Sequence, residues 1–302
     1  IEVVLGVGGG SALDAAKAVA GLLRTGRSVM DHLEGVGRGI PYEGPAVPFV
    51  AAPTTAGTGT EATRNAVLGE RGSAGYKRSF RHEALVPRWA VVDPDLLEGC
   101  PPELIAADGM DALTQLLEAY VSIRANPFSD ALAESGLLAA RDGLLPWFEG
   151  TGDPRAARER MAWASLLSGI ALAQAGLGAV HGLSPPLGSL FPIAHGVVCG
   201  TLVAAATEAN LRALGARAPG SPALAKYARA AEILSGRPAR GEDLVELLGR
   251  WTERLRLPRL GSFGVAEADL PRIVAGCRGA SMRTNPVELS DEEVAAIVRS
   301  RL

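Results

Sequence analysis

The feature that most constrains the fold is the opening of the chain, where the apolar run IEVVLGV leads straight into GGGSALDAAK. Residues 2–7 predict a buried strand, and the apolar spacing after the glycines predicts a helix over residues 12–23. A glycine turn between a strand and a helix exposes backbone N–H groups at a positive helix end, where a phosphate binds. Gly8, Gly9, Gly10 and Ser11 are therefore candidate phosphate ligands. The alternative is that Ser11 and Asp14 form a capping box that only starts the helix.

A second polar loop follows a second predicted strand. Residues 46–52 are apolar and end at Pro53, after which the chain continues as TTAGTGTE. The hydroxyls of Thr54, Thr55 and Thr58 suit a loop that donates hydrogen bonds to phosphates or a ribose, although one N-cap in a polar loop would need fewer of them. Ligands of open α/β sheets bind where such loops converge. The two loops together therefore predict a nucleotide site.

The order of elements predicts two domains. A third strand is predicted over residues 89–92, and strands alternating with helices favour a parallel, doubly wound sheet. From residue 101 onward helical periodicity dominates. We expect an α/β nucleotide-binding domain over residues 1–100 and an all-helical domain over residues 101–302.

Composition excludes several classes of partner. The 30 basic and 33 acidic residues give a net charge of −3, which argues against nucleic acid as a partner. No run of eighteen apolar residues predicts a membrane helix, and the first residues do not have the pattern expected of a targeting peptide. Cys100, Cys199 and Cys277 form no CxxC pair and are predicted to be reduced thiols of a cytoplasmic protein.

Lysine is rare in this chain: the only lysines are Lys17, Lys77 and Lys226, and arginine is used at the other Lys/Arg positions. The first two lie close in sequence to the two loops, which suggests positions where a point charge is needed. We count Asp14 and Lys77 among the candidate cofactor-binding residues. Lys226 has no motif around it, so chance is the alternative.

A polar stripe and two histidines are the candidates for a metal site. The stripe consists of Asp111, Gln115 and Glu118, at i, i+4 and i+7 of a predicted helix. It is either a solvated face or a site where Asp111 and Gln115 direct their oxygens at one ion. His181 and His195 bracket a segment rich in glycine and proline, and imidazole is a ligand of Zn and Fe. The other histidines, His32 and His82, are predicted to be ordinary surface or capping residues.

These segments resemble the iron-containing (group III) alcohol dehydrogenase family, which shares a dehydroquinate synthase-like fold. The resemblance covers essentially the whole chain and rests on GGGSALDAAK, PTTAGTGTEATRNAV, GMDALTQLLEAY, VHG…PPLG…HG and SMRTNPVELSDEE, in this order. It implies that Gly8–Ser11 hold a dinucleotide pyrophosphate, with Thr54, Thr55 and Thr58 near the cofactor. It also implies Asp111, His181 and His195 as catalytic metal ligands, Fe²⁺ as the metal with Zn²⁺ as the alternative, and a homodimer.

The sequence departs from this family at three places. Family members begin with a further strand, helix and strand, which the chain does not show, and that segment usually decides between NAD and NADP. Gln115 occupies a position where the family usually has a metal-binding histidine. Pro185 occupies a position where several members have a further histidine, proposed to relay protons.

The sequence therefore predicts an NAD(P)-dependent oxidoreductase that interconverts a small alcohol and its aldehyde or ketone by metal-assisted hydride transfer. The first alternative is a lyase similar to dehydroquinate synthase. The second is a nucleotide-binding protein whose metal site has decayed at Gln115 and Pro185.

Overall fold

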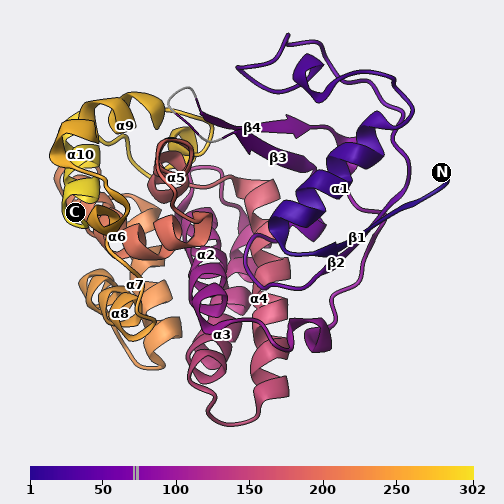
Figure 1. Cartoon of the computed structure of the whole chain (residues 1–302). Coiled ribbons are helices and arrows are strands. Elements are labelled where there is room, and N and C mark those ends of the chain that lie inside the picture. The colour runs from indigo at the N-terminus through magenta and orange to yellow at the C-terminus, as the bar shows by residue number, and fades with distance from the viewer. Residues whose placement is uncertain (71, 73–74) are drawn as a thin grey trace.

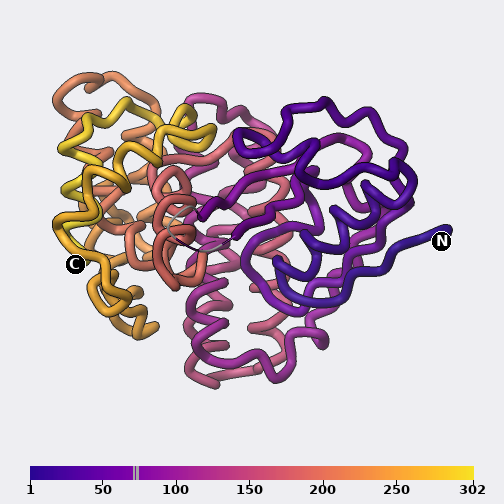
Figure 2. Tube along the Cα trace, turned by 45° about the horizontal axis from the view of Figure 1, so that its top comes forward, coloured from indigo at the N-terminus to yellow at the C-terminus, as the bar shows by residue number. Residues whose placement is uncertain are grey.

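The computed structural model describes residues 1–70, 72 and 75–302. A small sheet region carries the N-terminus at one side of the molecule, and helices with the C-terminus form the other side (Figure 1). A view turned by 45° also shows the two termini on opposite sides (Figure 2). The predicted fold class, a parallel α/β region followed by a helical region, is confirmed.

The parallel sheet contains β1 (Val4–Gly8), β2 (Phe49–Pro53) and β5 (Trp89–Ala90), in the order β1-β2-β5. Gly8 lies opposite Pro53, so the two loops of interest leave neighbouring strands at the same edge. Helix α1 (Gly10–Leu22) packs on these strands, and Leu13 and Phe49 are among the residues buried between them. All three predicted strands and the first helix exist, with ends displaced by up to three residues.

An antiparallel hairpin of β3 (Asn65–Glu70) and β4 (Tyr76–Arg81) was not predicted. β4 has the sequence YKRSFR, in which only Phe80 is fully buried, so it lacks the apolar alternation of a typical strand. His32 stacks on Phe80 and is buried, so the prediction that His32 lies at the surface is wrong. His82 caps a short 3₁₀ helix by accepting from the N–H of Ala84, as expected of a capping residue.

Helices make up the rest of the chain. The longer ones are α2 (Pro102–Val121), α3 (Pro127–Glu149), α4 (Pro154–Ala175), α5 (Ala179–Leu190), α6 (His195–Arg217), α7 (Pro222–Ser235), α8 (Gly241–Arg254), α9 (Leu270–Gly276) and α10 (Asp291–Arg299). The 3₁₀ helices are η1 (Val29–Asp31), η2 (Thr60–Ala62), η3 (Glu83–Leu85), η4 (Pro94–Leu97), η5 (Leu260–Phe263), η6 (Glu267–Asp269) and η7 (Met282–Thr284). Four of the α-helices begin with a proline. The N–H of the first helical residue has no partner within the helix, so proline loses no helical hydrogen bond at this position. Helix α2 is surrounded by α3, α4 and α6, and nearly all of it is buried.

Helix α5 corrects the prediction of a Gly/Pro-rich link between the two histidines, because the segment is helical and includes Pro185 and Pro186. Pro185 has no N–H to donate to the carbonyl of His181 four residues earlier. The hydroxyl of Ser184 donates to that carbonyl instead, at 3.4 Å. The side chain therefore replaces the bond that the proline removes.

The threonine loop, which we define as residues 54–60, is in backbone contact with the helical region. Gly59 has φ +60°, and a Cβ added at Gly169 on α4 would lie 2.2 Å from the carbonyl oxygen of Gly59. A Cβ added at Gly57 would meet Asp108 on α2 at 2.7 Å. Only glycine permits such close approach, so these residues hold the loop against α2 and α4.

By length and composition α6 could cross a membrane, and so could α4 and α5 together were they not bent by 104°. However, 61% of the apolar stretch of α6 is buried inside the protein. Burial of this kind is typical of a core helix.

Candidate metal and nucleotide site

The glycine turn and the threonine loop are in contact. The N–H of Thr54 donates to the carbonyl of Gly8 at 3.0 Å. A Cβ at Gly9 would lie 3.2 Å from the side chain of Thr55, and one at Gly10 would lie 2.7 Å from the side chain of Thr58. The structure thus brings together the two loops that the sequence singled out.

The start of α1 is left open to a ligand. Gly9 is its N-cap, and among the described residues no side chain caps it. The capping box predicted as the alternative for Ser11 and Asp14 is therefore wrong. Helix N–H groups without a partner are a binding site for an anion such as phosphate.

Lys17 has a structural position. Its side chain is fully buried, and its amino group donates to the carbonyls of Thr60, Thr63 and Asn65 at 2.7–2.9 Å. Burial lowers the pKa of Lys17 to about 8, although the charges of Asp14 and Glu61 oppose that effect. The rarity of lysine suggested a point charge at this position. The ammonium of Lys17 has a structural role, because it anchors the end of the threonine loop to α1.

Asp14 and Lys77 lie near the glycine turn. Asp14 is buried, and its Oδ1 has no hydrogen-bond partner among the described residues. Burial raises its pKa to about 7, against the opposing charges of Lys17 and Lys77. The charge of Lys77 also contributes to lowering the pKa of His195, so its ammonium acts on both Asp14 and the histidine cluster.

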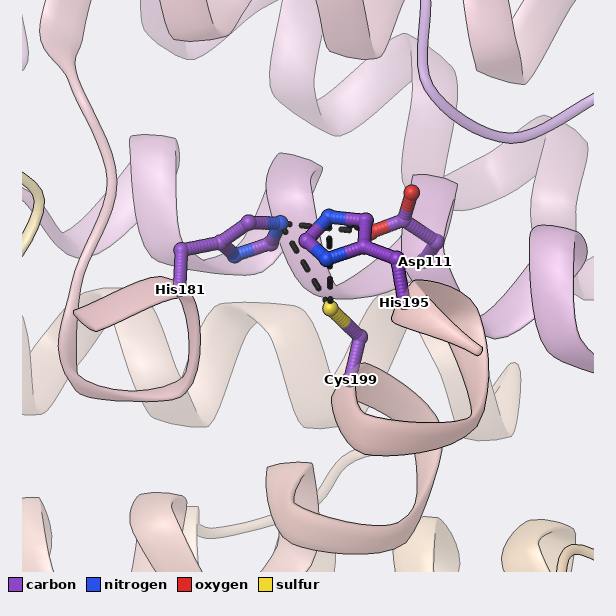
Figure 3. Close-up of side chains that lie close together, drawn as sticks. All are labelled: Asp111, His181, His195 and Cys199. Carbon is purple, nitrogen blue, oxygen red and sulfur yellow. Dashed lines mark hydrogen bonds and ion pairs between the residues drawn. The ribbon is translucent and has the colours of Figure 1, made fainter. Parts of the chain in front are cut away.

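Four side chains from three helices point toward one another in Figure 3. Asp111 comes from α2, His181 from α5, and His195 and Cys199 from the first turns of α6. Asp111 Oδ1 lies 3.2 Å from His181 Nε2 and 3.6 Å from His195 Nε2. One ligand atom of each of the four residues lies within 4.8 Å of the others.

The polar stripe on α2 is buried. Asp111, Gln115 and Glu118 are at most 6% exposed, so the interpretation of a solvated face is wrong. Because α3, α4 and α6 all pack on α2, the stripe faces the interior of the helical region. Buried polar groups need partners, and each of these residues has them.

Glu118 orients His181. Its carboxylate accepts from His181 Nδ1 at 2.7 Å and from the backbone N–H groups of Gly178 and Val180 at 2.9 and 2.7 Å. With Nδ1 directed at Glu118, Nε2 is the ring nitrogen that faces Asp111 and is available to a metal. A carboxylate behind a histidine in this way is the usual second layer of a metal site.

The electrostatics of the cluster favour an ionised Asp111. Burial alone would raise its pKa, but His195 and the hydrogen bond from His181 outweigh burial and hold the pKa well below its ordinary range. Burial likewise lowers the pKa of His181, yet Cys199, Asp111 and Glu118 together raise it well above its ordinary value. Burial and then the charge of Lys77 lower the pKa of His195 to about 3, although the charge of Asp111 opposes them.

Gln115 is held by two neighbours. Its Nε2 donates to Asp111 Oδ2 at 3.2 Å, and its Oε1 lies 3.1 Å from the hydroxyl oxygen of Ser168, which is also 2.7 Å from the carbonyl oxygen of Ser165. The same hydroxyl lies 3.4 Å from the carbonyl oxygen of Gly57, which links the cluster to the threonine loop. Ligation by Gln115 stays a prediction and would require its amide to turn.

Sequence reasoning missed several members of the site. Cys199 was interpreted only as a reduced thiol, although its spacing of i+4 from His195 places both on one helix face. All three cysteines, each within the described residues, do carry free thiols. Asp108 was not singled out; burial and then the charge of Asp111 raise its pKa to about 6, and a hydrogen bond to Thr55 opposes them.

The donors of Asp111, His181 and His195 fit a divalent metal. Two N or O ligands at tetrahedral angles and bond lengths of ~2.0–2.2 Å lie about 3.4 Å apart, and the distances from Asp111 to the two imidazoles are 3.2 and 3.6 Å. One carboxylate with two imidazoles is a ligand set that Zn²⁺ and Fe²⁺ accept.

A parallel sheet with an open glycine turn, next to a buried carboxylate–imidazole cluster, defines a nucleotide- and metal-dependent oxidoreductase. Comparison with known proteins agrees. Residues 1–94 match the model of the iron-containing alcohol dehydrogenases, and residues 105–302 match that of the C-terminal part of the Fe-containing alcohol dehydrogenase family. The chain belongs to the iron-containing alcohol dehydrogenase family.

Similar proteins cover almost the whole chain. It is 34% identical to alcohol dehydrogenase 4 of Saccharomyces cerevisiae strain YJM789, over 99% of the chain and 75% of that protein. It is 35% identical to the 1-propanol dehydrogenase PduQ of Salmonella typhimurium, over 100% of the chain and 78% of that protein. The crystal structure of a 1,3-propanediol oxidoreductase superposes with a TM-score of 0.87 at 31% identity, covering 100% of this chain and 77% of that one.

The protein is accordingly an alcohol dehydrogenase, and the lyase alternative is not favoured. Membership of this iron-containing family implies a bound metal. The assigned roles of individual site residues and the domain boundary at about residue 100 remain predictions.

Proposed function

We propose that the protein interconverts a small alcohol and its aldehyde or ketone by hydride transfer to or from NAD or NADP, with a divalent metal held by Asp111, His181 and His195. The observation that carries this proposal is the buried cluster of these three side chains, linked through Gln115 and Ser168 to the threonine loop. Fe²⁺ is the expected metal, and Zn²⁺ is the alternative.

The cofactor would bind across the contact between the glycine turn and the threonine loop. Its pyrophosphate would accept hydrogen bonds from the open N–H groups at Gly10 and Ser11, and the hydroxyls of Thr54, Thr55 and Thr58 would bind nearby. Lys77 supplies a positive charge on the same side. A sulfoacetaldehyde reductase of Bifidobacterium kashiwanohense, solved in complex with NAD⁺, superposes with a TM-score of 0.85 at 27% identity, which supports NAD as the cofactor.

A metal bound at the cluster would polarise the substrate oxygen and stabilise the alkoxide during hydride transfer. The chain itself orients the cluster: Glu118 fixes the tautomer of His181, and Gln115 holds Asp111. Pro185 carries no proton, so water or a ribose hydroxyl would have to relay the proton of the alcohol.

The partner we propose is a small alcohol or carbonyl compound, with neither nucleic acid nor membrane involved. A cytoplasmic location and a homodimer remain predictions from the sequence. The name of one relative, NAD-dependent methanol dehydrogenase of Bacillus methanolicus, favours NAD over NADP.

The test compares Asp111→Asn with Asp142→Asn, whose carboxylate pairs with Arg141 and Arg160 away from the site. We expect the wild type and Asp142→Asn to bind about one metal ion per chain and to consume NAD(P)H with an aldehyde. Asp111→Asn should lose most of both. Turnover that Asp111→Asn leaves unchanged would contradict the metal role, and nucleotide binding without any turnover would support the decayed-site alternative.

A further inference from the structure

The sulfur of Cys199 has no evident role in the function proposed so far, yet it lies at the centre of the site. It is fully buried, 3.7 Å from His181 Nε2 and 3.9 Å from His195 Nε2. In Figure 3 the side chain points at the same space as the carboxylate and the two imidazoles.

We propose that Cys199 is a fourth protein ligand of the metal, so that the ligand set is Asp111, His181, His195 and Cys199. This inference rests on the proposed function, because it presumes that the other three residues hold a metal. The thiol proton leaves to solvent as the sulfur–metal bond forms, and no electrons are transferred.

The distances match this ligand set. A sulfur at ~2.3 Å and a nitrogen at ~2.0–2.1 Å from one ion, at a tetrahedral angle, lie about 3.6 Å apart. The two sulfur–nitrogen distances are 3.7 and 3.9 Å, close to that value without any movement of the backbone. All four ligand atoms lie within 4.8 Å of one another, as the corners of one coordination tetrahedron must.

The surroundings also favour sulfur as the fourth ligand of the metal. The amide nitrogen of Gln115, the other candidate for a fourth ligand, faces Asp111 at 3.2 Å, while its oxygen lies 3.1 Å from the hydroxyl oxygen of Ser168. His195 and Cys199 are one turn apart at the start of α6, so the helix places both donors on one face. His195 Nδ1 is buried and has no hydrogen-bond partner among the described residues. His195 therefore lacks a carboxylate partner of the kind that Glu118 provides for His181.

A thiolate ligand would change the chemistry of the centre. It adds a negative charge and a soft donor where an amide would add neither, and soft donors favour Zn²⁺. Four protein ligands also require substrate oxygen to enter as a fifth ligand, which zinc sites accommodate during catalysis.

The test is the absorption spectrum of the protein stripped of metal with a chelator and reloaded with Co²⁺, combined with the Co²⁺ dissociation constant. Thiolate-to-cobalt charge transfer gives an intense near-ultraviolet band, whereas N and O ligands alone do not. The variants are Cys199→Ser and, as a matched control, Cys100→Ser, whose thiol is partly exposed and outside the cluster.

We expect the band in the wild type and in Cys100→Ser, and its loss in Cys199→Ser. Because loss of an outer partner alone costs about 10–100-fold in metal affinity, Cys199→Ser should bind Co²⁺ at least about tenfold more weakly. Stoichiometric Co²⁺ without the band in the wild type overturns the ligation by sulfur and leaves the proposed function standing. Failure of the wild type to bind any Co²⁺ overturns both. Absence of the band from the wild type overturns the proposal even if Cys199→Ser does not fold.

Discussion

The role of Glu118 can be tested by removing its charge and keeping its shape, in the variant Glu118→Gln. The carboxylate serves four N–H donors: Oε2 accepts from Gly178 N, His181 N and His181 Nδ1, and Oε1 accepts from Val180 N. Glutamine has one carbonyl oxygen, so its NH₂ group must face at least one of these N–H groups. We therefore expect weaker metal binding and a less stable protein.

The magnitudes follow from these contacts. If the amide oxygen stays on His181 and Gly178, the N–H of Val180 becomes a buried donor without a partner, at a cost of about 1–3 kcal/mol. That loss corresponds to a fall of the melting temperature by roughly 2–4 °C for each kcal/mol. The bond to His181 also loses its ionic character, and an outer partner of this kind contributes about 10–100-fold to metal affinity.

The assay is a competition between the protein and a metal-binding dye, alongside thermal unfolding of the metal-free protein. Glu134→Gln is the matched control, because the carboxylate of Glu134 is partly exposed, accepts from the hydroxyl of Tyr120 and lies outside the metal cluster. A folded Glu118→Gln protein with the metal affinity of Glu134→Gln would refute the reasoning, since the tautomer of His181 would then need no carboxylate.

Three further variants test the loops beside the cluster. Lys17→Met leaves three buried carbonyls without their donor, so we expect the free energy of unfolding in urea to fall by about 2–4 kcal/mol; an unchanged urea midpoint would show that the loop needs no anchor. Gly10→Ala places a Cβ 2.7 Å from Thr58 and should weaken NAD(H) binding about tenfold or more by calorimetry. Gly215→Ala, whose Cβ meets nothing within 4 Å among the described residues, should bind as the wild type does. Asp14→Asn should be more stable than the wild type at pH 8, with a smaller difference at pH 5, in urea unfolding at both values.

The sign of the last prediction follows from the pKa of Asp14, which burial raises from 3.8 to about 7 in the folded protein. Between these values the folded protein keeps a proton that the unfolded chain has released. The contribution of Asp14 to stability is therefore complete below pH 4 and is lost as the pH rises to 7. Three pKa units correspond to about 4 kcal/mol at most. A difference between the two proteins that does not grow with pH would show that Asp14 does not titrate in this range.

The sequence predicts the parts of this molecule in which local pattern and tertiary structure agree. The strands that carry the two loops are apolar and end at glycine or proline, so their existence and order follow from periodicity. The contact between Gly10 and Thr58 was expected because both loops follow neighbouring parallel strands. The pair of histidines was visible because histidine is rare in the chain.

Other features depend on packing that no local pattern shows. The stripe on α2 has the spacing of a solvated face, and only the helices around α2 bury it. β4 was missed because its strand conformation comes from pairing with β3 and from burial of Phe80. Cys199 was missed because a single cysteine indicates a site only when other donors from distant segments surround it.

The contact between Gly59 and Gly169 has a consequence for how the enzyme opens. Two backbones that touch with no side chain between them allow rotation about the contact but cannot come any closer. Since Gly59 ends a loop that starts at the sheet, we expect the sheet and the helices to turn about this point when cofactor enters and leaves. The part of the sheet most distant from the Gly59–Gly169 contact would then move most. The metal ligands, which lie on the helices, would keep their positions relative to one another.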